Sequence, residues 1–383
     1  MVNIKKPTIP GIHTISNIWK IVQEIDLRPI RDEAERSIHL AIVGKKGVGK
    51  QVLANFMRTD PVRRKFVEHT PIWLTEPVNV PEDLNVDLII LLIDASSEDF
   101  SLERKLLSHW QEAGREVLSF FAVSGSIDRD SILEKSFGLY AEHQVLGSVD
   151  DLDYLQDVFV PVVVGMLPDD ILPLGRQFPL FRRVIARKLI DDTCVANAIY
   201  SFSTGLAEVI PVFDIPLNVA DIVVLTKAQA FLIYKLGLAL GYSDRWQDYV
   251  AEFGSVLGGG FLWRQVARQL IGLIPIWGIV PKTAVAYAGT YAIGQVVLLW
   301  YLTGRHVDKS QLVDIYRDAF RRGKILAKSL TKRQKPFKKR IYSKTSNYKL
   351  LSSGNGIVRI CPRCGLENAP NAGFCNYCGV RLE

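Results

Sequence analysis

The chain has 383 residues, of which 48% are hydrophobic and 23% are charged, and its formal net charge at pH 7 is +7. This length is enough for two or three domains. Lys5, Lys6 and Pro7 are followed by no long apolar run, so we expect no secretory signal. Four of the five cysteines lie in one cluster, which favours a metal site in a reducing compartment over a disulfide-stabilised secreted protein.

The positive charge is concentrated near the C-terminus. Residues 328–383 contain 12 Lys and Arg residues but only two Glu residues, so the net charge of this segment is +10. The rest of the chain therefore carries a net charge of −3. The basic character belongs to this segment and not to the domains that precede it.

Residues 1–36 form an N-terminal arm for which we expect a helix. Its apolar residues share one helical face: Ile15, Ile18, Trp19, Val22 and Ile25. We expect this face to pack against the protein itself, and the alternative is a helix that lies on a membrane surface.

A glycine-rich segment follows the first predicted strand. The apolar run 37–43 predicts a buried strand, and residues 52–57 predict a helix. The residues that connect them match the phosphate-binding loop Gly-x-x-x-x-Gly-Lys-Ser/Thr in all but the last letter: Gly44, Lys45, Lys46, Gly47, Val48, Gly49, Lys50 and Gln51. Backbone N–H groups and the lysine of such a loop hold phosphates, while its final hydroxyl holds Mg²⁺.

Gln51 stands where that hydroxyl belongs, so the loop is predicted to hold a nucleotide without an evident Mg²⁺ ligand. The alternative is a Gly/Lys turn between an ordinary strand and helix.

The segments after the loop alternate between the two kinds of secondary structure. We expect strands at 70–75, 86–94, 117–123 and 144–146, and helices at 101–113 and 130–141. This alternation predicts an α/β doubly wound domain over residues 37–168. Asp94 ends one of the strands, and we expect it to cap the following turn rather than to bind a metal.

On these motifs the domain resembles the Era-like small GTPases. Residues 73–77, Trp-Leu-Thr-Glu-Pro, stand where the family has Trp-Asp-Thr-Pro-Gly. Leu74 therefore replaces the Asp that helps to position Mg²⁺, and Pro77 replaces the Gly whose N–H meets the γ-phosphate. Residues 125–128 align with Asn-Lys-x-Asp and keep only Asp128, which the resemblance implies reads the guanine base.

The resemblance implies a GTP- or GDP-binding domain, but the groups needed for phosphoryl transfer are altered. We therefore expect a pseudo-GTPase that binds nucleotide weakly and hydrolyses it slowly or not at all, with bound Mg²⁺ in doubt. The alternative is an active GTPase of the Era-like class.

Residues 169–327 are predicted to form an all-α hydrophobic domain. Residues 283–304 are 22 uncharged residues, long enough to cross a bilayer as a helix. A buried helix of a soluble domain has the same composition, so insertion and burial both stay open. A hairpin formed by residues 269–304 that dips into the membrane is a further possibility.

This region also resembles the YcjF-like domain of unknown function, over roughly residues 194–304. The residues that carry the resemblance are Thr204-Gly205-Leu206-Ala207, Ile210-Pro211, Asp214-Ile215-Pro216, Asp221 and Ile274-Pro275-Ile276-Trp277-Gly278. The resemblance implies membrane association without an established activity. We expect Asp214 and Asp221 to be helix N-caps rather than a catalytic pair, and Cys194 to be a buried core thiol.

Residues 328–358 form a basic linker. Its first part, residues 328–349, contains nine Lys and Arg residues and no acid. Three interpretations stay open: a solvated linker, a segment that attracts anionic lipid and keeps its side of a membrane cytoplasmic, and, less favoured, a nucleic-acid-binding segment.

Residues 359–383 are predicted to form a small zinc ribbon. Two Cys-x-x-Cys pairs are separated by ten residues and supply four thiolates: Cys361, Cys364, Cys375 and Cys378. Four sulfur ligands complete the tetrahedral shell of a structural Zn²⁺ and leave no position for a catalytic water. The sequence does not indicate which partner such a ribbon binds.

Together these features predict a regulatory or scaffold protein at the cytoplasmic side of the cell membrane. If residues 283–304 are a soluble core helix, the protein is cytoplasmic instead. The alternatives are an active GTPase and a nucleic-acid-binding protein that uses the basic linker and the zinc ribbon.

Overall fold

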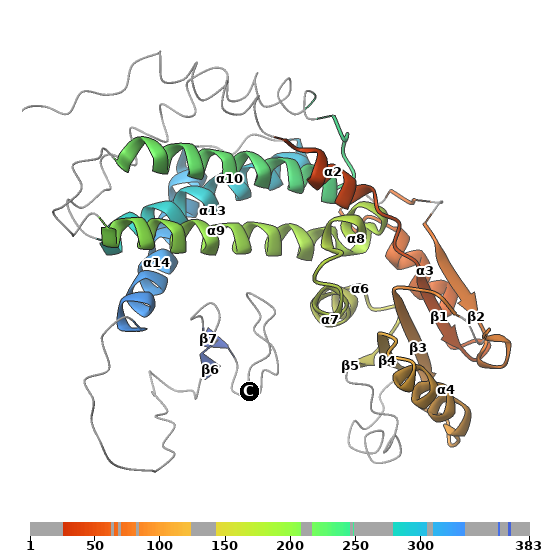
Figure 1. Cartoon of the computed structure of the whole chain (residues 1–383). Helices are drawn as coiled ribbons and strands as arrows, with labels where there is room; N and C mark the ends of the chain where they lie inside the picture. The colour runs from red at the N-terminus through yellow and green to blue at the C-terminus, as the bar shows by residue number, and fades with distance from the viewer. Residues whose placement is uncertain are drawn as a thin grey trace, which may run out of the picture. The chain divides into compact units, whose positions relative to one another are not determined.

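The computed structural model describes residues 26–62, 65–67, 70–81, 84–123, 143–207, 217–245, 248, 279–304, 309–333, 359–360 and 367–368. It divides into two compact units. The first, the sheet unit, comprises Ile30–Lys188 and Gly237–Asp244. The second, the helical unit, comprises Met1–Pro29, Leu189–Leu236 and Arg245–Glu383. Figure 1 shows the elements of both units.

The sheet unit is built on five parallel strands in the order β2-β1-β3-β4-β5. The three inner strands are buried except for the last residue of β3, as is usual for parallel strands covered on both faces. The edge strands are shorter than β3 and only partly buried. The strands are β1 (Leu40–Gly44), β2 (Ile72–Thr75), β3 (Leu88–Asp94), β4 (Val117–Ala122) and β5 (His143–Gly147).

Helices flank this sheet, which confirms the predicted α/β class. All five expected strands are present, and the expected helices after the glycine-rich loop and at 101–113 are α3 and α4. The expected helix 130–141 lies outside the described residues. The helices of this unit are α2 (Arg28–Glu35), α3 (Lys50–Arg58), η1 (Pro77–Asn79), α4 (Ser101–Glu112), α6 (Leu152–Tyr154), η2 (Leu155–Phe159), α7 (Val160–Met166), α8 (Ile171–Gln177) and η3 (Pro179–Phe181).

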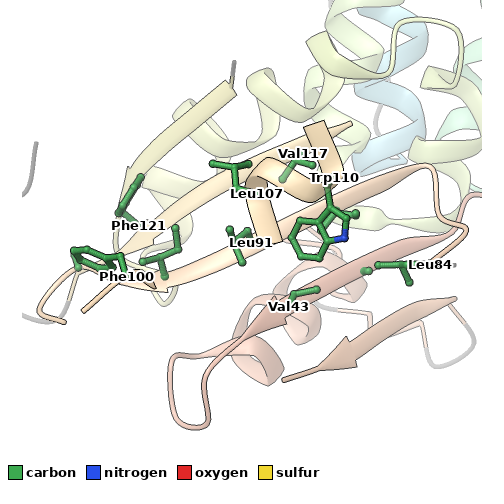
Figure 2. Packing of buried hydrophobic residues seen from close by; sticks show 12 residues of the cluster. Val43, Leu84, Leu91, Phe100, Leu107, Trp110, Val117 and Phe121 are labelled. Atoms are coloured by element: carbon green, nitrogen blue, oxygen red, sulfur yellow. The ribbon is translucent and has the colours of Figure 1, made fainter. Parts of the chain in front are cut away.

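One face of the sheet is covered by α4. Leu107 and Trp110 of this helix pack against residues of β1, β3 and β4, such as Val43, Leu91 and Val117 (Figure 2). Burying these side chains is worth roughly 1.5–3 kcal/mol each. This core therefore holds α4 against β1, β3 and β4.

The first segment of the sheet unit, Ile30–Lys188, runs beyond the predicted domain 37–168, and the unit also includes Gly237–Asp244. The cause is aromatic packing between η2 and the segment beyond it. The ring of Phe159 lies 6.0 Å from that of Phe181, which in turn lies 6.3 Å from Phe178. All three side chains are fully buried. Their apolar surface joins residues 169–188 to the α/β domain.

The helical unit is formed by long helices, which confirms the predicted helical region. Small residues let them approach closely: a Cβ added to Gly323 would lie 2.9 Å from the Cα of Ala284. Ala284, Ala288 and Ala292 recur every four residues and are buried. The long helices are α9 (Arg182–Ala207), which starts in the sheet unit, α10 (Leu217–Ala239), α13 (Ile279–Thr303) and α14 (Lys309–Arg333).

Two expectations for this region need correction. Asp221 is not a helix N-cap, because α10 begins at Leu217 and continues beyond it. The basic segment does not begin as an irregular linker at residue 328, because α14 continues to Arg333. Cys194 is a fully buried thiol, as expected. Asp214, the helix expected at 15–25 and residues 269–278 of the predicted hairpin 269–304 lie outside the described residues.

A two-stranded antiparallel pair lies near the C-terminus. Its strands are β6 (Arg359–Ile360) and β7 (Glu367–Asn368), with Ile360 opposite Glu367. The first Cys-x-x-Cys pair falls between them in the sequence. Cys361, Cys364, Cys375 and Cys378 themselves lie outside the described residues.

Candidate phosphate-binding site

The glycine-rich loop lies at the carboxyl edge of the sheet, between β1 and α3. The chain runs from β1 to its neighbour β2 on one side, and β3 lies on the other side of β1. The strand order therefore reverses at β1, and ligands of open α/β sheets bind at such a point. The structure brings Gly44 to Gln51 together here, in the position that the sequence predicted.

Glycines shape the loop. A Cβ on Gly44 would lie 2.6 Å from the carbonyl oxygen of Leu92 on β3, so only glycine fits there without a shift. Gly47 and Gly49 have φ values of 84° and 101°, a left-handed conformation that favours glycine. Gly49 precedes the first residue of α3, and the free N–H groups and positive dipole of a helix start attract anions.

Lys50 reaches back across the loop. Its Nζ donates to the carbonyl oxygens of Gly44, at 2.6 Å, and Lys45, at 2.8 Å. A lysine ammonium has three donors, so one further hydrogen bond can be made to a phosphate. The lysine thus braces the loop and keeps a positive charge beside the start of α3.

Gln51 does not take over the role of the missing hydroxyl. Its Nε2 donates to Oδ1 of Asn55, one turn along α3, at 3.0 Å. The side chain is exposed and runs along the helix surface. The last residue of the loop therefore carries an amide that is hydrogen-bonded to a side chain of α3.

The other candidate metal ligands are also occupied or replaced. Asp94 accepts hydrogen bonds from the N–H of Ser96 at 2.9 Å and from its hydroxyl at 2.6 Å, so it caps the turn as expected. Leu74 lies in β2 opposite Ile42, and Pro77 begins η1. These positions offer no oxygen side chain and, at Pro77, no N–H.

A buried acid beside the loop escaped the sequence analysis. Glu103 lies in the first turn of α4 and is only 2% exposed. Its Oε1 lies 2.9 Å from Nζ of Lys45. The signal was present in the sequence, because Glu103 shares the buried face of α4 with Leu107 and Trp110 at four- and three-residue steps.

Asp99 also lies next to the loop. Its backbone carbonyl accepts a hydrogen bond from Lys45 Nζ at 3.2 Å. The pKa of its carboxyl group is lowered, chiefly because Ser101 donates both its N–H and its hydroxyl to it. Lys45 adds a smaller effect in the same direction. Lys45 therefore faces two acidic residues, Asp99 just before α4 and Glu103 in its first turn.

Two predicted sites lie outside the described residues: Asp128, expected at the guanine base, and the four cysteines of the zinc ribbon. Within the described ranges, no three His, Cys, Asp or Glu side chains gather as metal ligands would.

In the helical unit, one described helix segment, Lys282–Thr303, is long and apolar enough to cross a membrane. Half of its most apolar stretch is buried inside the structure. Gly294 packs against Ile190 of α9, and Gly323 of α14 packs against Ala284. Neighbouring helices therefore cover a large part of this segment.

In comparisons with known proteins, no protein-family model and no curated protein match the chain.

Proposed function

We propose that this chain is a regulatory or scaffold protein built on a doubly wound P-loop domain of the Era-like class. In this proposal the loop 44–51 holds a guanine nucleotide weakly by its phosphates, and hydrolysis is slow or absent. One observation supports the proposal: the glycines and Lys50 lie together at the start of α3, while Gln51 and Asp94 are hydrogen-bonded to Asn55 and Ser96.

The chemistry of phosphoryl transfer explains why this difference matters. A metal ion that bridges the β- and γ-phosphates neutralises the charge that develops during transfer. Gln51 is hydrogen-bonded to Asn55 and Asp94 to Ser96, so neither side chain is placed to fix that ion. Backbone N–H groups and Lys50 still attract phosphate. Binding with little turnover is the behaviour that this combination supports.

A nucleotide titration tests the proposal. GDP and GTP are titrated into the full chain with and without Mg²⁺, and phosphate release is followed under multiple-turnover conditions. We expect weak binding that changes little with Mg²⁺, and no sustained release. Tight, Mg²⁺-dependent binding with repeated turnover would instead establish the active GTPase.

Lys50→Ala is the informative variant in this titration, with Lys105→Ala as its matched control. Both changes remove one lysine, but Lys105 is exposed on α4 and lies outside the loop. Loss of a charged hydrogen bond is expected to weaken binding roughly ten- to a hundredfold in Lys50→Ala only. Equal affinities in the two variants would show that the nucleotide does not bind at the loop.

We further propose that the helical unit associates with the cytoplasmic face of a membrane. The apolar segment in α13 and the exposed cations Lys324, Lys328 and Lys332, which recur every four residues on α14, support this. Flotation of the full chain with vesicles tests it. Release by salt indicates surface binding through the cations, resistance to alkaline carbonate indicates insertion of α13, and no flotation contradicts the proposal.

Finally, we propose that residues 359–383 form a zinc ribbon. The β6–β7 pair, whose strands flank the first Cys-x-x-Cys pair in the sequence, supports a short hairpin at that pair. Metal analysis of the purified chain should find one zinc ion per chain and about none in Cys361→Ser/Cys364→Ser. Salt-sensitive RNA binding that depends on residues 328–383 would favour the nucleic-acid alternative.

A further inference from the structure

One carboxylate oxygen next to the phosphate loop has no hydrogen-bond partner among the described residues. Glu103 accepts Lys45 through Oε1, whereas its Oε2 is buried and makes no hydrogen bond in the described part of the chain. A carboxylate can accept several hydrogen bonds, so this one is under-satisfied. Among the described residues its ion pair is with Lys45, and that lysine belongs to the loop.

The two partners differ sharply in their exposure. The Glu103 side chain is 3% exposed, whereas that of Lys45 is 44% exposed. A buried charge that loses its partner is strongly unfavourable, while an exposed lysine loses little when it moves. Separation of the pair is therefore costly mainly because of Glu103. This cost keeps Lys45 beside Glu103.

We infer that Glu103 is an internal counter-ion of the phosphate loop, which competes with nucleotide phosphate for Lys45 and keeps the affinity of the loop low. This inference rests on the proposed phosphate binding at residues 44–51. If Lys45 turns to a phosphate, Glu103 is left buried without a counter-charge. If Lys45 stays on Glu103, the loop has one fewer cation for the phosphate. Both routes oppose the binding of a polyphosphate.

A purely structural role is the competing explanation. Glu103 would then only fasten the start of α4 to the loop, and its charge would not influence the ligand. The two explanations differ in one readout, because a fastening residue affects stability but its neutralisation does not tighten phosphate binding.

The test uses the full chain and the variant Glu103→Gln, with inorganic pyrophosphate and GDP as probes in calorimetric titrations at low and high salt. Glutamine keeps the shape of the side chain and an oxygen that can accept from Lys45. We expect Glu103→Gln to bind both probes roughly tenfold more tightly than the wild type, with a steeper loss of affinity as salt is raised. Glu112→Gln is the matched control, since it removes an exposed acid from the last position of the same helix, and it should leave affinity unchanged.

Two further variants control for misfolding and test whether Lys45 is the cation that binds the phosphate. Glu103→Met has no polar atom to bury and should tighten binding in the same way. Lys45→Met/Glu103→Met should lose that gain, because the cation set free in the single variant is absent.

The outcomes separate the two proposals. If wild type and Glu103→Gln bind equally, or the variant binds less tightly, the counter-ion is refuted while phosphate binding stands. If only Glu103→Gln binds, the counter-ion is supported, and the proposed binding by the wild type fails. If neither the wild type nor a folded Glu103→Gln or Glu103→Met binds either probe, both proposals fall.

Discussion

The two units bury polar groups in different ways. The sheet unit buries two acids and pairs each with a cation: Asp60 with Arg182 at 3.2 Å and Glu103 with Lys45 at 2.9 Å. In the helical unit, the residues identified as buried and polar are uncharged, and Asn197 donates from Nδ2 to Oγ1 of Thr290 at 2.8 Å. Buried charges make a structure sensitive to the loss of one partner. Neutral hydrogen-bonded pairs and small residues also let helices pack closely, but the loss of one partner there costs less stability.

The largest expected effect comes from the buried ion pair of the sheet unit. Arg182→Met removes the ion pair that Arg182 makes with Asp60, a residue that is 4% exposed. We expect this to destabilise the sheet unit by about 3–5 kcal/mol. Hydrogen exchange of peptides from the sheet unit measures the change. Arg317→Met is the control, because its pair with Asp314 is exposed and is worth about 0–1 kcal/mol.

A smaller effect is expected from alkaline pH in the helical unit. Burial raises the pKa of Tyr316 from 10.0 to about 12. The unfolded chain therefore loses this proton at a lower pH than the folded chain does, so stability falls as pH rises from about 10 to 12. The loss is expected to reach roughly 2–3 kcal/mol at the upper end. Tyr316→Phe should remove this share of the pH dependence, and identical alkaline profiles would contradict the expectation.

Close helix packing provides the next test. In Gly323→Val a side chain enters the space occupied by the backbone of Ala284, so α13 and α14 must move apart. We expect a loss of about 1–3 kcal/mol, as for other overpacked cores. The control is Gly289→Ala in α13, where an added Cβ meets nothing within 4 Å and helix propensity should improve by about 1 kcal/mol. Thermal unfolding followed by circular dichroism compares the two variants.

The smallest effect tests the neutral pair directly. Thr290→Val leaves the buried amide of Asn197 without its acceptor at Oγ1 and should cost about 1–2 kcal/mol. In Asn197→Leu/Thr290→Val both polar groups are gone, so stability should recover in part. If the double variant is less stable than the sum of the single changes, the hydrogen bond is not the reason for the loss. Hydrogen exchange in α9 and α13 reports the differences.

The strands of the sheet, its helices α3 and α4 and the glycine-rich loop could all be predicted from the sequence. Their signals are local, since an apolar run, a helical period and a set of glycines act within a few residues. The same holds for the capping role of Asp94, whose partner Ser96 is two residues away. The sequence also showed that Gln51 lacks the hydroxyl of a metal-binding loop.

Long-range contacts decided the rest. Glu103 is 58 positions from Lys45, and only the packing of α4 on the sheet brings its carboxylate to the loop. Phe178 and Phe181 lie beyond residue 168, and their buried rings join this segment to the sheet unit through Phe159. Composition left α13 open to insertion or burial, and in the structure half of its most apolar stretch is buried. Local patterns determine which segments become strands and helices. The partner of a charge and the surface that covers an apolar face depend on residues distant in the sequence, which only the tertiary structure brings together.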